Sequence, residues 1–196
     1  MSHSLPGRIK AANADFKVWE IPGIVPEGAG DHLYVWLRKD GLSTPHVLSE
    51  LSQHFYLRSL YLGCAGRKDK EAVTEQWISL PTTVGGRLDA LPADGVPQIL
   101  ADGCWSIERR VLHARRLRTA QLRGNRFALR VTGLNQAERN ELIERSQRLA
   151  AEGRLLNLFG EQRFVDDEAL AKARVLLGER KLRGRQSRFV VSVAQA

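Results

Sequence analysis

Residues 63–79 read GCAGRKDKEAVTEQWIS, and this stretch sets the expectations for the fold and the site. The apolar run at 60–65 is typical of a buried strand, and Gly66 lets the backbone turn directly after it. Asp69 follows, with cationic side chains on both sides. Those cations are Arg67, Lys68 and Lys70. Neighbouring positive charges favour the ionised carboxylate, the form that attacks carbon, so Asp69 is a candidate nucleophile. The alternative is an exposed loop whose acid pairs with its own lysines.

Hydrophobic periodicity around this stretch predicts the remaining elements. Strands are expected at 15–21, 32–39, 75–80, 105–113 and 126–132, the last two as an antiparallel pair with a turn at 118–125. Helices are expected at 44–56 with Thr44 as N-cap, at 135–153 with Asn135 as N-cap and Gly153 at the end, and at 167–177. The segment 81–102 reads as an irregular connection. This order predicts an α+β fold with a mixed, largely antiparallel sheet and flanking helices, as one domain over 1–196.

Positive charge is concentrated in two blocks of the 196-residue chain, whose net charge is +8. Residues 108–130 contain eight arginines and one acid, and residues 172–196 contain seven bases and one acid. The first block comprises Arg109, Arg110, Arg115, Arg116, Arg118, Arg123, Arg126 and Arg130. Arginine forks bind phosphate well, so a polyanionic partner is expected, with a solvated basic face as the alternative.

Several classes of protein are disfavoured by what the sequence contains. No apolar stretch approaches the roughly 20 residues of a membrane span, and the start lacks the apolar core of a signal peptide, so a soluble cytoplasmic protein is expected. Cys64 and Cys104 lie outside any CxxC, and the five histidines show no ligand spacing, so neither a disulfide nor a metal is expected. A phosphate loop at 63–68 is a weak alternative, because Asp69 stands where such a loop has serine or threonine.

The central stretch resembles the signature of the TruD family of tRNA pseudouridine synthases, A-G-x-K-D-K-x-A-x-T-x-Q. The matching residues are Ala65, Gly66, Lys68, Asp69, Lys70, Ala72, Thr74 and Gln76. The resemblance implies part of the pseudouridine synthase catalytic core, and isomerisation of a uridine in tRNA, uridine 13 in the D-arm region, with Asp69 as the nucleophile. It also implies that no cofactor is needed and leaves open whether the aspartate attacks the sugar or the base.

Further family motifs occur in the same order along nearly the whole chain. They are Lys10 with Asp15, Phe16 and Glu20; Gly30, His32, Leu33, Lys39, Gly41 and Thr44; the G-N-x-F of 124–127; and the N-x-F-G-x-Q-R-F of 157–164. By resemblance the RNA-binding residues are Lys10, Phe16, Glu20, Lys68, Asn125, Phe127, Asn157 and Arg163, and Phe127 would stack on the extruded base. Leu158 and Val165 depart from the family's tyrosine and glycine. Taken singly, Phe16 reads as core, Asn125 as a turn residue and Arg163 as a helix anchor.

Family members are longer than this chain. The resemblance implies that an inserted domain and the C-terminal part of the core are absent, and that the unpaired sheet edge favours self-association. The alternative function is therefore a truncated, catalytically inactive RNA-binding fragment of such an enzyme.

Overall fold

The computed structural model describes residues 7–82 and 88–153. The chain divides into two compact units, Met1–Leu134 and Asn135–Ala196, which are described in turn. The fold is α+β with a mixed, largely antiparallel sheet, as the sequence predicts. No helix in the described residues has the length and apolar character needed to cross a bilayer.

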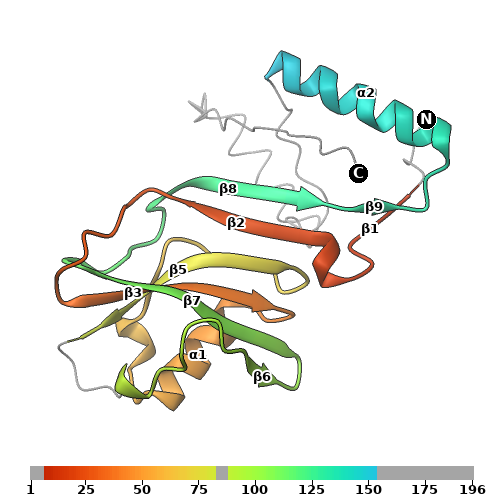
Figure 1. The fold of residues 1–196 in the computed structure, drawn as a ribbon. Helices are drawn as coiled ribbons and strands as arrows, with labels where there is room; N and C mark the ends of the chain where they lie inside the picture. Colours follow the sequence, from red (N-terminus) through yellow and green to blue (C-terminus); the bar gives the residue numbers. More distant parts are fainter. Residues whose placement is uncertain (1–6, 83–87, 154–196) are drawn as a thin grey trace, which may run out of the picture. The chain divides into compact units, whose positions relative to one another are not determined.

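A seven-stranded sheet forms the body of the first unit (Figure 1). Its strands are β2 (Phe16–Pro22), β3 (His32–Asp40), β4 (Gly63–Cys64), β5 (Val73–Pro81), β6 (Gln98–Leu100), β7 (Gly103–His113) and β8 (Leu122–Leu129). The spatial order is β6-β7-β3-β5-β2-β8, and β4 pairs with one end of β5. Among the strand pairs of the described residues, only β2–β5 is parallel. A separate two-stranded sheet joins β1 (Arg8–Ile9) to β9 (Val131–Thr132).

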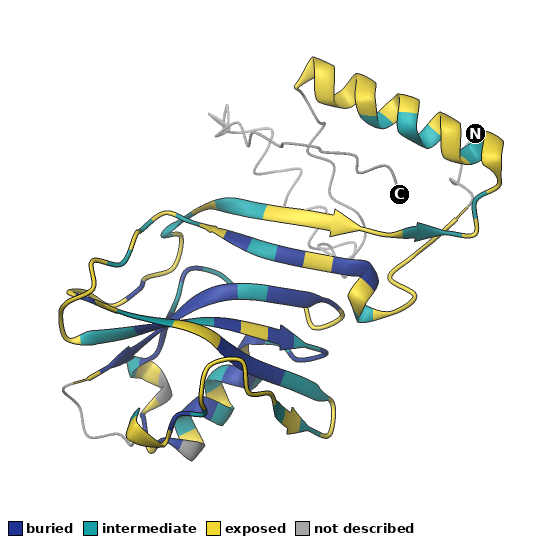
Figure 2. Ribbon diagram, in the orientation of Figure 1, coloured by how far each residue is buried: buried dark blue, intermediate teal, exposed yellow. Residues whose placement is uncertain are grey.

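The larger apolar core lies between the sheet and α1 (Thr44–His54). Alternate residues of β3 and β5 face the helix, and Leu42, Val47 and Leu51 pack against them. The sheet members of this cluster include Val35, Leu37, Ile78, Leu80 and Ile107. A smaller cluster on the opposite face contains Tyr34, Ala65, Trp77 and Leu117. Figure 2 shows the result: β5 is mostly buried, β3 contains mainly buried and half-buried residues, and β8 at the edge is mostly exposed.

The expected pairing of 105–113 with 126–132 is wrong. β7 pairs with β3 and β6, whereas β8 pairs with β2. The segment between them does contain a turn, in which the Gln121 N–H donates to Arg118 O at 3.2 Å, but it does not join the two strands into a hairpin. Before the turn, Leu117 is buried beside Tyr34 and Trp77, and its N–H donates to Ser79 Oγ at 3.0 Å. One apolar residue inside an arginine-rich stretch therefore fixes the path across the sheet.

Of the strand expected at 60–65, only Gly63–Cys64 is observed as a strand, so most of this prediction is wrong. A 3-10 turn, η2 (Ser59–Tyr61), precedes the two-residue strand β4. Leu62 and Ala65 are buried while Leu60 is exposed, so the run does not present one continuous face. Two further short 3-10 turns are η1 (Asn13–Asp15) and η3 (Leu88–Ala90).

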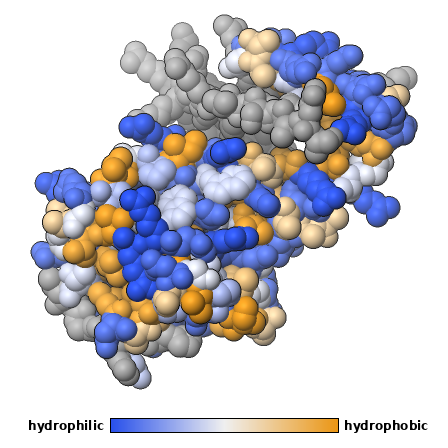
Figure 3. All heavy atoms as spheres, in the orientation of Figure 1, coloured by the Kyte–Doolittle hydropathy of each residue, from blue (hydrophilic) through white to orange (hydrophobic). Residues whose placement is uncertain are grey.

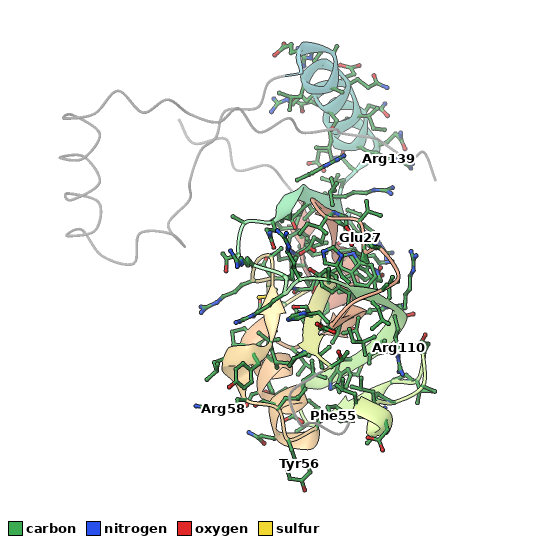
Figure 4. The ribbon with its side chains drawn as sticks, turned by 90° about the vertical axis from the view of Figure 1, so that its left-hand side faces the viewer. Glu27, Phe55, Tyr56, Arg58, Arg110 and Arg139 are labelled. Atoms are coloured by element: carbon green, nitrogen blue, oxygen red, sulfur yellow. The ribbon has the colours of Figure 1, made fainter. Side chains whose placement is uncertain are left out.

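The N-cap of helix α1 lies one residue earlier than expected. Ser43 is the N-cap, and its Oγ accepts a hydrogen bond from the His46 N–H at 3.3 Å. Thr44 cannot serve because its hydroxyl is committed to Gln76 and Lys68. The helix ends at His54, and Tyr56, with φ of 52°, projects from the end of α1 with its ring exposed (Figure 4).

The described part of the second unit is α2 (Gln136–Glu152). Asn135 caps it in a reciprocal capping box with Glu138, and Gly153 ends it in the left-handed region with φ of 60°. Glu141 and Arg145, four residues apart, form an ion pair. These features confirm the predicted helix. The helix expected at 167–177 and the second basic block lie outside the described residues.

Gly63 gives a test of the packing around β4. An added Cβ would overlap the Leu117 carbonyl oxygen and Ser79 Oγ. We expect Gly63→Ala to lower the free energy of unfolding by about 1–3 kcal/mol, the usual cost of overpacking. Urea unfolding followed by circular dichroism measures this change.

The matched control is Gly124→Ala in β8, where an added Cβ meets nothing within 4 Å. This variant should be neutral or slightly stabilising, because alanine restricts the unfolded chain. Equal stabilities of the two variants would contradict the described packing of the 114–121 segment on β4.

Candidate functional site

Four of the predicted site residues lie on the paired strands β2 and β8: Phe16 and Glu20 on β2, and Asn125 and Phe127 on β8. Phe16, Val18 and Glu20 alternate inward on β2 and are all buried. On the neighbouring strand, Asn125 lies opposite Glu20 and Phe127 lies opposite Val18. Directly paired side chains share a face of the sheet, so β2 and β8 bring these residues together.

Two phenylalanine rings form a stacked pair on this face. The Phe16 and Phe127 centroids are 6.0 Å apart with an interplanar angle of 5°. The Lys10 ammonium lies 4.2 Å from the centroid of Phe16. Phe16 is buried, whereas Phe127 is 45% exposed. The exposed ring of Phe127 is therefore an accessible flat surface, supported from beneath by a second ring.

The loop that carries Asp69 is held by its main chain. Gln76 Nε2 donates to Gly66 O at 2.9 Å, the Lys68 N–H donates to Thr44 Oγ1 at 2.9 Å, and Lys39 Nζ donates to Asp69 O at 2.6 Å. Thr44 Oγ1 in turn donates to Gln76 Oε1 at 2.9 Å. We call Lys39, Thr44 and Gln76 the loop clamp. All three clamp side chains are buried, so the backbone at 66–69 is fixed from the interior.

Lys68 ties the same loop to β2. Its Nζ lies 3.1 Å from Glu20 Oε2, and both side chains are buried. Glu20 Oε1 also accepts from the Trp77 N–H at 3.4 Å. Burial raises the pKa of Glu20, against the opposing effects of the Lys68 charge and hydrogen bonds. Lys68 therefore links Asp69, its chain neighbour, to the strand pair that carries Asn125 and Phe127.

The Asp69 carboxylate itself is exposed and forms no ion pair with another described residue. The neighbouring lysines have other partners: Lys68 pairs with Glu20, and Lys70 Nζ lies 3.3 Å from Asp102 Oδ2. The structure thus differs from the alternative in which the acid pairs with its own lysines. A fixed backbone and an uncommitted carboxylate are what a nucleophile requires.

Asn125 has an unused hydrogen-bonding group. Its Oδ1 is buried and has no hydrogen-bond partner within the described ranges. A buried acceptor left unpaired costs free energy, so such an atom marks a position for a ligand donor.

All arginines of the first basic block except Arg110 are exposed, and the side chains of four of the eight contact other described residues. Arg110, a residue of β7, binds Asp94 at 2.8 Å and the Pro92 carbonyl (Figure 4). Arg116 donates to Leu62 O, Arg126 lies 5.4 Å over the Trp19 ring, and Arg130 lies 3.7 Å from Asp15. Arg109, Arg115, Arg118 and Arg123 are exposed. Trp19 faces away from Glu20, so Arg126 lies on the sheet face opposite Asn125.

No metal site is visible in the portion of the chain that the structure describes, since no three His, Cys, Asp or Glu side chains cluster suitably there. Hydrophilic and apolar residues are intermixed over the face shown in Figure 3. The phosphate-loop alternative fits poorly, because the Lys68 ammonium is already paired with buried Glu20. Asn157 and Arg163 lie outside the described residues.

The loop clamp was not expected as a functional feature. Gln76, Thr44 and Lys39 all match family motifs, and Thr44 is also the expected N-cap, but none of these expectations places the three side chains against the loop. The available signal was a polar side chain on the buried face of an apolar strand: β5 is almost entirely buried, yet Gln76 points toward the core. Such a residue must have a partner, and here the partner is the loop.

The chain is similar to several proteins named tRNA pseudouridine synthase D. The chain is 38% identical over 158 residues to tRNA pseudouridine synthase D of Anaeromyxobacter dehalogenans, covering 81% of this chain and 42% of that protein. It is 37% identical over 186 residues to tRNA pseudouridine synthase D of Pseudomonas aeruginosa, covering 90% and 49%. The crystal structure of the putative tRNA pseudouridine synthase D (TruD) from Methanosarcina mazei matches with a TM-score of 0.66 and 28% identity, covering 83% of this chain and 36% of that one.

The chain thus spans about half the length of the curated relatives it matches. The family model described as tRNA pseudouridine synthase D (TruD) matches residues 2–190, which is nearly the whole chain. Its central motif forms one clamped loop, and its N-terminal and G-N-x-F motifs meet on one sheet face. The protein belongs to the TruD family of tRNA pseudouridine synthases.

Proposed function

We propose that this chain supplies the nucleophile-bearing part of a tRNA pseudouridine synthase, with Asp69 as the nucleophile. The observation that carries the proposal is the loop clamp, which fixes the Asp69 backbone while leaving its carboxylate free. By family resemblance the substrate is uridine 13 in the D-arm region of tRNA. The substrate also argues for a cytoplasmic location.

The proposed reaction is an isomerisation that needs no cofactor. The bond between N1 and C1′ breaks, the uracil turns, and a bond between C5 and C1′ forms. C5 loses a proton and N1 gains one, so no electrons are exchanged with another molecule. Covalent addition of the Asp69 carboxylate, either to the sugar or to the base, divides the change into two easier steps.

The target base must leave its stack to reach the carboxylate, at a cost of a few kcal/mol. Stacking on the exposed Phe127 ring offsets about 1–3 kcal/mol of this cost. Asn125 Oδ1 is a free acceptor for the uracil N3–H. Four further residues position these groups rather than react. Lys10 lies over the Phe16 ring, which stacks on Phe127, and Glu20 pairs with Lys68 beside Asp69.

The remaining predicted contacts extend this proposal to the rest of the RNA. Exposed arginines such as Arg115, Arg118 and Arg123 would bind phosphates, which makes tRNA affinity fall steeply with salt. Asn157 and Arg163 stay candidate RNA contacts. We also propose that residues 1–196 belong to one catalytic domain, and that the exposed edge strand β8 favours self-association.

A second candidate function is favoured by the coverage of the relatives, which is 42–49% of their length for the two quoted above. In this case the chain binds tRNA but does not isomerise uridine by itself. Steep salt dependence of tRNA binding, together with no pseudouridine after prolonged incubation, would support this function.

Asp69→Asn tests the nucleophile. The amide keeps the shape of the side chain but cannot add to carbon, so we expect pseudouridine formation to fall by a factor on the order of 10³ or more with tRNA binding retained. Release of tritium from tRNA labelled at uridine C5 measures turnover. Glu71→Gln, an exposed acid on the same loop, is the control and should keep wild-type turnover. Wild-type turnover in Asp69→Asn would remove Asp69 from the mechanism.

Thr44→Val tests the clamp. Valine keeps the volume but leaves the Lys68 N–H and Gln76 Oε1 without their partner. We expect the free energy of unfolding to fall by about 1–3 kcal/mol, the cost of unpaired buried groups. We also expect slower turnover at unchanged tRNA affinity, because the loop loses its fixed position. Thr119→Val, at an exposed position in the 114–121 segment, should change neither quantity. Unfolding in urea and single-turnover assays report the two effects.

A further inference from the structure

Lys39 is an unusual member of the loop clamp because it buries a charge. Its side chain lies on the same face of β3 as Val35 and Leu37, and the residue is only 1% exposed. Its Nζ donates to the Asp69 main-chain oxygen at 2.6 Å. Within the described ranges it forms no ion pair with a carboxylate, unlike Lys68 and Lys70.

Such burial is costly for an ammonium group. A buried charge is normally paired with an opposite charge or changes its protonation, and a neutral side chain of similar length would fill the same space more cheaply. Burial lowers the pKa of Lys39 to about 8. The carboxylates of Asp69 and Asp40 oppose this decrease, and the Lys68 charge adds to it. Its paired neighbours on the adjacent strands, Thr74 on β5 and Trp105 on β7, carry no charge.

We propose that Lys39 is a positioning residue of the site: its ammonium holds Asp69 through the main-chain carbonyl, and the hold weakens when the ammonium loses its proton. The proposal rests on the proposed role of Asp69 as nucleophile. A charged donor forms a hydrogen bond roughly twice as strong as a neutral donor, so the neutral amine would hold the loop less firmly.

The direction of the pH effect separates this role from a purely structural one. The charged fraction of Lys39 falls as the pH rises through about 8, so the loop should loosen above that value. The free energy of unfolding of the whole protein should instead increase as the pH rises above about 8. The pKa of Lys39 lies below its ordinary value of 10.5, so the unfolded chain binds the proton more tightly. The cost of the buried charge is fully present below pH 8 and is relieved as the pH rises toward 10.5.

Hydrogen exchange followed by NMR tests the hold in the whole chain without requiring turnover. The reporters are the amides of Lys68 and Ala72, which flank Asp69 and are hydrogen-bonded. Their protection factors, corrected for intrinsic exchange, should fall between pH 7 and 9, while that of the core residue Ile78 in β5 should not fall, because global stability rises over this range. At pH 7, Lys39→Met should lower the protection of Lys68 and Ala72 by roughly 10- to 100-fold and abolish its pH dependence.

The matched control is Arg38→Met, an exposed neighbour on the other face of β3, which should behave as the wild type. Constant protection of Lys68 and Ala72 from pH 7 to 9 in the wild-type protein would overturn the proposal, even if Lys39→Met failed to fold. Wild-type protection in a folded Lys39→Met protein would also overturn it.

Turnover gives a second readout. Lys39→Met should slow single-turnover pseudouridine formation at unchanged tRNA affinity, and the loss of rate near pH 8 in the wild type should disappear. If Asp69→Asn stayed active, the proposed function would fall while the exchange data would still decide whether Lys39 holds the loop. If the exchange data showed no hold and Asp69→Asn were inactive, only the role of Lys39 would fall.

Discussion

The structure depends on hydrogen bonds between buried polar side chains and the main chain of one loop. Lys39, Thr44 and Gln76 come from β3, α1 and β5, and each bonds a different peptide group at 66–69. Hydrogen bonds in a dry interior are strong when every group is paired and costly when one group is left over. The loop geometry is therefore set by the sheet and the helix together, and the Asp69 side chain needs no contact of its own.

The parallel pairing of β2 with β5 brings the Asp69 loop next to the strand that carries Glu20. Every other described strand pair is antiparallel, yet this one places Lys17–Trp19 beside Val73–Glu75 and so brings Glu20 within reach of Lys68. β8 then adds Asn125 and Phe127 from the other side of β2. The result is a single sheet face with an acid on a fixed loop, a buried ion pair, an unpaired amide oxygen and a stacked ring.

Much of the fold could be predicted because its signals are local. Alternation located β2, β3 and β5, and the capping pattern around Asn135 and Gly153 located α2. The errors arose where tertiary contacts overrode local pattern. Because Leu117 is buried, the chain crosses the sheet and β7 and β8 do not form a hairpin. Ser43 rather than Thr44 is the N-cap of α1, because the Thr44 hydroxyl is bonded to Gln76. The family motifs predict that Asp69 and Phe127 belong to one site. They do not predict that Lys68 pairs with Glu20 or that Lys39 bonds the main chain of the Asp69 loop, because both contacts depend on the tertiary structure.

The separation in sequence of the paired strands has a consequence for how the site forms. Lys17 pairs with Val73, 56 positions away, and Glu20 pairs with Asn125, 105 positions away. Contacts between such distant segments require closure of long loops, so they form slowly compared with helices and hairpins. The reactive constellation is thus absent from a nascent or partly folded chain. The site residues come together only when β2 has paired with both β5 and β8, so catalytic activity requires complete folding of the sheet.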